Sequence, residues 1–584
     1  MLNKLKNILK SQKIDYFIVP NNDEFCSEYL SESEKRIEFL TGFNGSNAVL
    51  VIKNNGKNAF FTDGRYSLQA LQQLNKKEFE IFDLSKKSVL KYLVENVKKS
   101  EIVALDAKLH SKKQASLIKG HIEAKKAKFL SLTKNPIDEI WKNRPDLLNN
   151  EIFILKDKYS GEKTSSKINR ILEKLDKNSD AILLNFAPSI NWLLNIRSND
   201  IEFTPLALCQ ALIFKNGKVD LFINENRLNE EVKKYFIKNK IKVIEPQNLE
   251  NHLKKIKIKT IQIDPNYVNF ALFEIFQKQK FNIIEKNDPI LALKAIKNKM
   301  EIKNNILAHE KDGIALTKFL YWLSQNEKTD EILASKKLLE FRKLDKDFIY
   351  PSFETISGFG SNGAIIHYRV DKKSNKKFSK NNLYLVDSGG QYLSGTTDVT
   401  RTILIGNKPK KEHIENFTRV LKGHIAIARA KFPIGTKGSD LDVLARYHLW
   451  QNFKDYAHGT GHGVGQFLSV HESPPSISKN SNDAELKEGM VLSNEPGYYE
   501  NNKYGIRIEN LMLVEKSKNK NFLQFKTLTL APIDPNLINF KMLTYPEKKW
   551  LREYHAEILK KFGKKLNERE KNWLKEICQN SSKN

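Results

Sequence analysis

The segment LYLVDSGGQYLSGTTDVTRTILI, residues 383–405, contains two apolar, β-branched runs that each carry one aspartate, Asp387 and Asp398. Such runs predict strands, and the polar stretch at 391–394 predicts the turn of a hairpin. In that hairpin the two aspartates lie opposite each other, with Cβ atoms about 5 Å apart. Two carboxylates at this separation repel each other unless a cation joins them.

A second pair of acidic residues repeats this pattern. GMVLSNEPGYY (489–499) and YGIRIENLMLV (504–514) predict two strands that flank a polar turn. Glu495 and Glu509 are symmetrical about Asn502, so the second hairpin also predicts two carboxylates that face each other.

A glycine-rich segment, AHGTGHGVG (457–465), lies between the two hairpins. Its alternating glycines make a helix costly, and the spacing of His458 and His462 predicts a strand or strand-loop with both imidazoles on one face. This excludes a helical HExxH zinc site.

Four carboxylates and one histidine form a hard, oxygen-rich ligand set, which suits Mn²⁺, Co²⁺ or Fe²⁺ better than a structural zinc ion. Two such ions about 3.5 to 4 Å apart bind and ionise a bridging water, the nucleophile of many hydrolases. The pattern therefore predicts a dinuclear metal site. Its predicted ligands are Asp387, Asp398, His462, Glu495 and Glu509.

Length and cysteine content are consistent with a multidomain intracellular protein. At 584 residues, a size of about 150 residues per domain predicts three or four domains. The three cysteines, Cys26, Cys209 and Cys578, are far apart, so no disulfide framework or CxxC site is indicated. We therefore expect a reducing compartment, the cytoplasm above all. The N-terminus lacks a signal-peptide pattern and no apolar run reaches about 18 residues, so no membrane association is expected.

The formal charge of +29 suggests polyanion binding, but its distribution does not favour that interpretation. The lysines are spread through every region, as in SKKSVLKYLVENVKKS (85–100). No arginine-rich tract, Cys/His finger or basic zipper accompanies them. We predict a solvated surface rich in lysine and asparagine and no specific nucleic-acid partner, with polyanion binding as the alternative.

Strand and helix signals alternate through the first half of the chain and predict two related α/β domains, 1–150 and 151–296. Residues 292–325 show a long amphipathic helical pattern that opens a catalytic domain, 297–584. From about residue 520 the tail ends in charged helices.

The motifs, taken in order, resemble those of the pita-bread metallopeptidases, and among them the long, three-domain Xaa-Pro aminopeptidases (aminopeptidase P). The resemblance covers essentially the whole chain. Further matching segments are RIEFLTGFNGSNAVLVI (36–52), AFFTDGRYSLQA (59–70), INWLLNIRSNDIEFTP (190–205), LTLAPIDPNL (528–537) and EKKWLREYH (547–555). The resemblance implies an α/β (α+β) protein: two creatinase-type N-terminal domains, the second a diverged copy of the first, then a pita-bread catalytic domain. It also implies a homodimer.

The resemblance also implies how the ligands divide between two divalent ions, for which Mn²⁺ is predicted and Co²⁺, Fe²⁺ and Zn²⁺ are alternatives. Asp398 and Glu509 bridge both ions, Asp387 completes one shell, and His462 with Glu495 completes the other. A bridging hydroxide then attacks the scissile carbonyl, and Glu495 transfers the proton to the leaving nitrogen.

Residues around the ligands are assigned by the same resemblance. His367, His458 and His471 match outer histidines that bind substrate and donate hydrogen bonds in the transition state. Arg507 matches a residue that supports a ligand carboxylate by charge pairing. Arg65 reaches longer peptides or holds a turn, and the two interpretations stay open. No role is assigned to four histidines on helical stretches: His309, His413, His424 and His448.

The expected activity is hydrolysis of the N-terminal Xaa-Pro bond with release of the first residue. Proline removes the N–H from this bond and fixes φ, so general peptidases fail on it. One alternative is an Xaa-Pro dipeptidase (prolidase), against which the length and the N-terminal segments argue. Another is a non-catalytic pita-bread scaffold, against which the five intact ligand types argue.

Overall fold

The computed structural model describes residues 1–147, 149–479 and 484–580. The chain divides into two compact units. Residues 1–156 and 162–290 form the first, and residues 157–161 and 291–584 form the second. The first unit thus contains the first predicted N-terminal domain and most of the second, whose residues 157–161 and 291–296 belong to the second unit. The division at residue 150 stays a prediction.

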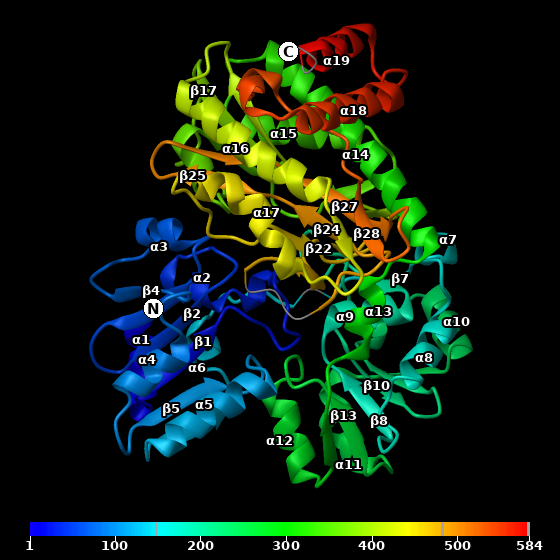
Figure 1. Cartoon of the computed structure of the whole chain (residues 1–584). Coiled ribbons are helices and arrows are strands. Elements are labelled where there is room, and N and C mark those ends of the chain that lie inside the picture. Colours follow the sequence, from blue (N-terminus) through cyan, green and yellow to red (C-terminus); the bar gives the residue numbers. More distant parts are fainter. Residues whose placement is uncertain (148, 480–483, 581–584) are drawn as a thin grey trace. The chain divides into compact units, whose positions relative to one another are not determined.

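The first unit contains two six-stranded sheets with the same topology. In Figure 1 the strands of the first sheet are blue and those of the second run from cyan to green. In each, the central strand pairs antiparallel with the next sheet strand along the chain and parallel with the fifth. The first sheet, in the order β4-β3-β2-β1-β5-β6, contains β1 (Tyr16–Pro20), β2 (Val49–Lys53), β3 (Asn58–Thr62), β4 (Phe79–Asp83), β5 (Ile102–Asp106) and β6 (Lys128–Leu132). The second, in the order β12-β11-β10-β8-β13-β14, contains β8 (Ala181–Leu184), β10 (Gln210–Phe214), β11 (Val219–Phe222), β12 (Ile241–Ile244), β13 (Thr260–Ile263) and β14 (Asn282–Glu285).

Both faces of the first sheet are buried, which explains why its strands read as continuous apolar runs. Phe17 and Val19 of β1 pack into one core, and Tyr16 and Ile18 into another. The helices of this unit are α1 (Leu2–Ser11), α2 (Arg36–Thr41), α3 (Ser67–Gln73), α4 (Val89–Asn96), α5 (Lys112–Ala124), α6 (Pro136–Ile140), α8 (Thr164–Leu172), α9 (Ala187–Leu194), α10 (Glu230–Lys238), α11 (Leu249–Lys255) and α12 (Phe270–Lys278), and a short ladder joins β7 (Phe153–Ile154) to β9 (Ile196–Arg197).

The second unit is built from antiparallel strands covered by helices. Its helices are α7 (Asp157–Ser160), α14 (Lys299–Gln325), α15 (Glu331–Lys343), α16 (Lys411–Ala428), α17 (Gly438–Trp450), α18 (Tyr545–Phe562) and α19 (Glu568–Asn580), and α13 (Pro289–Ala295) spans the junction of the two units. Its sheets are β16-β17-β20, β15-β18-β19, β21-β28-β27-β24-β22-β23 and β25-β26. Their strands are β15 (Phe348–Pro351), β16 (Ile356–Phe359), β17 (Asn382–Ser388), β18 (Gly390–Tyr392), β19 (Gly395–Thr396), β20 (Val399–Ile405), β21 (Lys431–Pro433), β22 (Gly461–Gly463), β23 (Glu472–Ile477), β24 (Val491–Asn494), β25 (Gly497–Glu500), β26 (Tyr504–Arg507), β27 (Asn510–Lys516) and β28 (Phe522–Thr527).

Apolar side chains of helices pack on both sides of the sheet β16-β17-β20. Leu383 of β17 packs with α16 and α18, whereas Tyr384 and Val386 pack with α14 and α15. Because side chains alternate along a strand, Asp387 projects to the same side as Leu383.

The long helix α14 starts at Lys299, seven residues after the start of the predicted pattern. Asn298 is the N-cap of α14. Its side chain accepts hydrogen bonds from the Met300 and Glu301 amides, and the Glu301 side chain accepts one from the Asn298 amide. This capping box fixes the N-terminus. Among the described residues, no helix combines the length and the apolar character that a membrane span requires.

Candidate metal centre

The first predicted hairpin forms, but its register differs from the prediction. Asp387 pairs with Thr400 and not with Asp398. Tyr392 pairs with Gly395, so the turn contains two residues, 393 and 394, and is centred one residue later than expected. A register change of two residues keeps each side chain on its face. The predicted direct pairing is therefore wrong, although carboxylate oxygens of Asp387 and Asp398 still converge within 4.8 Å.

The second predicted hairpin has the expected register. Asn494 pairs with Asn510, and Gly497 pairs with Arg507, so residues 495 and 509 occupy equivalent positions on the two arms. Both lie between the β24–β27 ladder and the β25–β26 ladder. Neither glutamate is therefore paired in a β-ladder. Their side chains approach the aspartates at this interruption between the two ladders.

The glycine-rich segment forms a loop and the short strand β22, with no helix, as predicted. A Cβ at Gly461 would lie 2.1 Å from the Ser493 carbonyl oxygen, and one at Gly463 would lie 2.4 Å from that of Glu472. Only glycine lets β22 approach its neighbours this closely. The close approach brings His462 to the carboxylates.

The imidazole of His462 is oriented for coordination through Nε2. Nδ1 lies 2.9 Å from the Gly463 carbonyl oxygen and donates to it, so in the neutral ring Nε2 carries the lone pair. Nε2 lies 3.5 Å from Asp398 Oδ2 and 3.5 Å from Glu495 Oε1. A lone pair facing two carboxylate oxygens requires a proton or a cation between them.

The carboxylates have the properties expected of ligands for divalent cations. Asp387 Oδ1 and Asp398 Oδ1 are buried and have no hydrogen-bond partner. Burial and then the neighbouring carboxylates raise the pKa of both Asp398 and Glu509 well above the ordinary value. Three sets of potential ligand atoms lie within 4.8 Å of one another: Asp387, Asp398 and Glu509; His462, Glu495 and Glu509; and Asp398, His462 and His471. The donor set therefore fits a pair of divalent ions.

The outer residues lie around this cluster in different ways. The His471 ring meets the His462 ring edge-on, with centroids 4.3 Å apart, and one of its ring nitrogens lies within 4.8 Å of a carboxylate oxygen of Asp398. His471 thus lies next to the predicted ligand His462, and its role as an outer histidine stays a prediction. His367 is half-buried, and the carbonyl of the preceding Ile366 accepts from Arg507 Nη2 at 3.4 Å.

Arg507 pairs with the carboxylate of Asp387, one of the predicted ligands: its Nη2 lies 2.6 Å from Asp387 Oδ2. Glu509 accepts instead from the Thr400 hydroxyl at 2.7 Å. Tyr499 has no predicted role, although it lies in the quoted NEPGYY motif. Its hydroxyl accepts from Arg507 Nη1 at 2.6 Å and lies 2.8 Å from His458 Nε2.

Arg65 belongs to the first unit and makes local contacts. Its Nη2 lies 2.7 Å from Asp63 Oδ2, and its Nε lies 3.0 Å from Asp63 Oδ1. The guanidinium also lies 5.5 Å from the centre of the Tyr66 ring. These contacts favour the turn-holding interpretation of Arg65.

Comparison with known sequences assigns all parts of the chain. Residues 306–516 match the model of metallopeptidase family M24, and 521–581 match the C-terminal region of peptidase M24. Residues 1–140 and 143–301 each match a creatinase/prolidase N-terminal domain. Xaa-Pro aminopeptidase 1 of Dictyostelium discoideum is 39% identical over 98% of this chain and 95% of its own length. The chain belongs to metallopeptidase family M24. The predicted family and fold class are thereby confirmed.

Solved M24 structures separate this chain from shorter family members. The X-prolyl aminopeptidase from Caenorhabditis elegans, described as a cytosolic enzyme with a di-nuclear active site, matches with a TM-score of 0.95 and 33% identity. The match covers 99% of this chain and 98% of that enzyme. The prolidase from Pyrococcus horikoshii OT3 matches with a TM-score of 0.51 and 27% identity, and covers only 63% of this chain.

Metal binding should strengthen as the pH rises, because protons compete with cations for Asp398 and Glu509. Without metal, the raised pKa values mean that the protonated forms favour the folded state, and this contribution is lost as the pH rises through those values. A cation instead binds the deprotonated forms. By scanning calorimetry we expect Mn²⁺ to raise Tm more at about pH 8 than at about pH 6. An equal or smaller rise at the higher pH would contradict this electrostatic description.

Proposed function

We propose that this chain is a metal-dependent aminopeptidase that hydrolyses the N-terminal Xaa-Pro bond of peptides and releases the first residue. The observation that carries the proposal is the convergence of four carboxylates and one imidazole, with two buried carboxylate oxygens that have no hydrogen-bond partner. Full-length relatives named Xaa-Pro aminopeptidase support this substrate class.

Asp387, Asp398, His462, Glu495 and Glu509 would hold two divalent ions, for which we propose Mn²⁺. When bound, such ions polarise the scissile carbonyl and ionise a water molecule. The assignment of Asp398 and Glu509 as bridging ligands is part of the proposal. The hardness of the carboxylate oxygens supports Mn²⁺ over softer ions.

The surrounding residues would hold the substrate and move protons. Glu495 is half-buried and its Oε2 lies 3.9 Å from His458 Nδ1, so its carboxylate is available to carry a proton to the leaving proline nitrogen. Burial raises the pKa of Tyr499, so its hydroxyl stays protonated between Arg507 and His458. We propose that His367 and His471 contact the substrate.

Two alternative functions are less well supported. The Pyrococcus prolidase lacks a counterpart for more than a third of this chain, which argues against a dipeptidase. A non-catalytic scaffold has no need for the orphaned carboxylate oxygens or for a histidine held in its coordinating tautomer. We also propose a cytoplasmic location, which the cytosolic relative from C. elegans supports.

Specificity should be tested by comparing Xaa-Pro-Yaa, Xaa-Ala-Yaa and the dipeptide Xaa-Pro. Loss of the proline ring removes apolar contact and should lower kcat/KM about 10- to 200-fold. The N–H introduced by alanine adds a donor that a proline site need not satisfy, which increases the ratio. Equal rates on both tripeptides would indicate a general aminopeptidase, and cleavage of the dipeptide alone would indicate a prolidase. As a control, His367→Ala should lower kcat and leave the metal content unchanged.

We propose that the chain forms a homodimer that buries an apolar stripe on α17 and the residues after it. The stripe consists of Val443, Leu444, Tyr447, Trp450 and Phe453. Phe453 is completely exposed, and Tyr447 is 51% exposed. Clustered exposed apolar side chains mark interaction sites in soluble proteins, and a closed two-fold dimer buries the same surface on both subunits.

The dimer should dissociate in Phe453→Asp, because each interface would bury two unpaired carboxylates. Light scattering coupled to size-exclusion chromatography should give twice the chain mass for the wild type and a mass closer to one chain for the variant. The matched control is Leu333→Asp, at an exposed position of α15 outside the stripe. A monomeric wild type, or a dimer that survives Phe453→Asp, would overturn this proposal.

A further inference from the structure

A buried polar layer lies behind the two strands that carry Glu495 and Glu509. It consists of Arg401 from β20, His424 from α16, Asn494 from β24, Asn510 from β27 and Tyr554 from α18, all at most 5% exposed. A missing partner in a buried polar network is costly, and in this layer Asn494 Oδ1 is the side-chain atom that has none among the described residues. The connections of this layer lead from the C-terminal helix α18 to the metal centre.

Asn494 precedes Glu495, Asn510 follows Glu509, and the two asparagines pair across the ladder. His424 joins them. Its Nδ1 lies 3.1 Å from the Asn494 carbonyl oxygen and its Nε2 lies 3.1 Å from Asn510 Nδ2. Burial lowers the pKa of His424 to about 3, so the neutral ring donates from Nδ1 and accepts at Nε2. This histidine, to which the sequence assigns no role, holds the positions next to both glutamates.

Arg401 on β20 contacts the backbone of Glu509 directly. Its Nη1 donates to the Glu509 carbonyl oxygen at 2.7 Å, and its Nη2 donates to Asn510 Oδ1 at 2.8 Å. Nη2 also donates to the Tyr554 hydroxyl at 2.9 Å. The guanidinium fork is planar and rigid, so fixing its outer nitrogens fixes the backbone carbonyl of Glu509.

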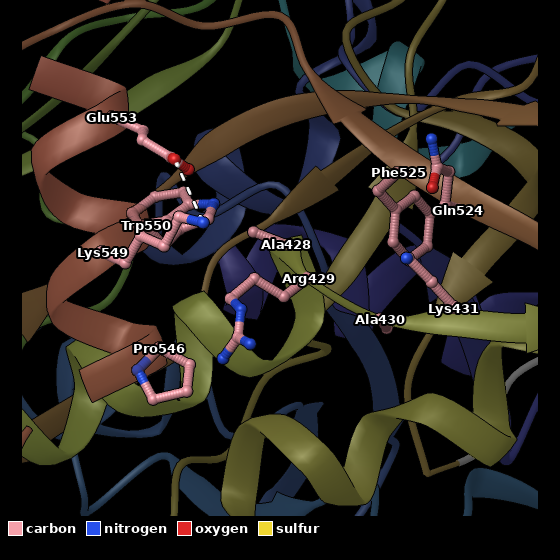
Figure 2. Close-up of a pocket in the computed structure, with 10 residues that line it drawn as sticks. All are labelled: Ala428, Arg429, Ala430, Lys431, Gln524, Phe525, Pro546, Lys549, Trp550 and Glu553. Atoms are coloured by element: carbon pink, nitrogen blue, oxygen red, sulfur yellow. Dashed lines mark ion pairs between the residues drawn. The ribbon is translucent and has the colours of Figure 1, made fainter. Parts of the chain in front are cut away.

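Tyr554, on helix α18, is the residue of the C-terminal segment that belongs to this layer. Its hydroxyl accepts from the Ala531 amide at 3.1 Å, and three oxygens lie within donor distance of it: the Ala531 carbonyl at 3.0 Å, the Thr529 carbonyl at 3.1 Å and Asn510 Oδ1 at 3.3 Å. Its ring stacks on Trp550 with centroids 5.1 Å apart and planes 7° apart. Trp550 lines a cavity of about 350 Å³. Figure 2 shows the ten residues that line it, and none of them is a proposed ligand. Trp550 thus contacts both this cavity and the ring of Tyr554.

We propose that Tyr554 is a positioning residue for the metal centre, because its hydroxyl accepts a hydrogen bond from Arg401 and thereby orients the guanidinium that holds Asn510 and the backbone carbonyl of Glu509. The inference rests on the proposed function, in which Glu509 is a metal ligand. It makes the C-terminal segment a working part of the site and not only a cover for the catalytic core. Partners that orient ligands in this way typically change metal affinity 10- to 100-fold when removed.

The test is Tyr554→Phe, which keeps the ring and its stack on Trp550 and removes only the hydroxyl. Isothermal titration of the metal-free full chain with Mn²⁺ should show a Kd increased about tenfold or more. Substitution with Co²⁺ should show an altered visible absorption spectrum, which reports ligand geometry without turnover. An unchanged Kd and an unchanged spectrum would overturn the proposal.

Two control variants separate positioning from general stability. Ile558→Val removes a methylene from a fully buried residue of the same helix and should lower Tm with no change in Kd for Mn²⁺. Tyr545→Phe removes an exposed hydroxyl from α18 and should change neither quantity. If Ile558→Val weakens Mn²⁺ binding as much as Tyr554→Phe, the effect is one of stability and the proposal fails. Failure of Tyr554→Phe to fold would also overturn it, since the hydroxyl would then support the fold itself.

The outcome can be distinguished from failure of the proposed function. A wild-type chain that binds Mn²⁺ but does not cleave Xaa-Pro peptides would refute the proposed activity, while the comparison of Kd values would still decide the role of Tyr554. A wild-type chain that binds no Mn²⁺ would refute both.

Discussion

Repulsion among four carboxylates in a small buried volume is the constraint on which the catalytic unit depends. At a separation of about 4 Å and an effective dielectric constant of about 20, each pair of charges repels by about 4 kcal/mol. The raised pKa values of Asp398 and Glu509 are the expected response in the absence of cations. Arg507, 2.6 Å from Asp387, offsets one charge. Two divalent cations would balance all four carboxylates and satisfy the orphaned oxygens of Asp387 and Asp398.

The fold supplies the rigidity that this crowding requires. Each acidic pair is carried by a hairpin, and His462 approaches through a strand whose flanking glycines leave no room for a Cβ. The surrounding polar groups are held in turn by residues from α16, α18 and β20. A metal site built on strands and helices in this way holds its ligands more closely than one built on loops. The glutamate backbone positions are thus determined by segments far from them in sequence.

The sequence predicted the parts of this arrangement that local patterns control. The register of the second hairpin followed from the symmetry of Glu495 and Glu509 about Asn502, which adopts a left-handed backbone at the turn. The first register was missed by two residues because the turn uses Leu393 and Ser394, a choice that the polar stretch does not distinguish. His424, Tyr499 and Tyr554 could not be assigned because their contacts come from distant elements. The alternating strand and helix signals also do not determine the order of the strands within a sheet, so the matching strand orders of the two N-terminal sheets could not be predicted from them.

The most direct test of the central claim is the number of metal ions that the folded chain binds. Equilibrium dialysis against Mn²⁺ followed by elemental analysis should give two ions per wild-type chain. Glu509→Gln, with a circular dichroism spectrum like that of the wild type, should bind at most one, since it removes a proposed bridging carboxylate. One ion or none in the wild type, or two in Glu509→Gln, would contradict the account of a dinuclear centre held by these carboxylates.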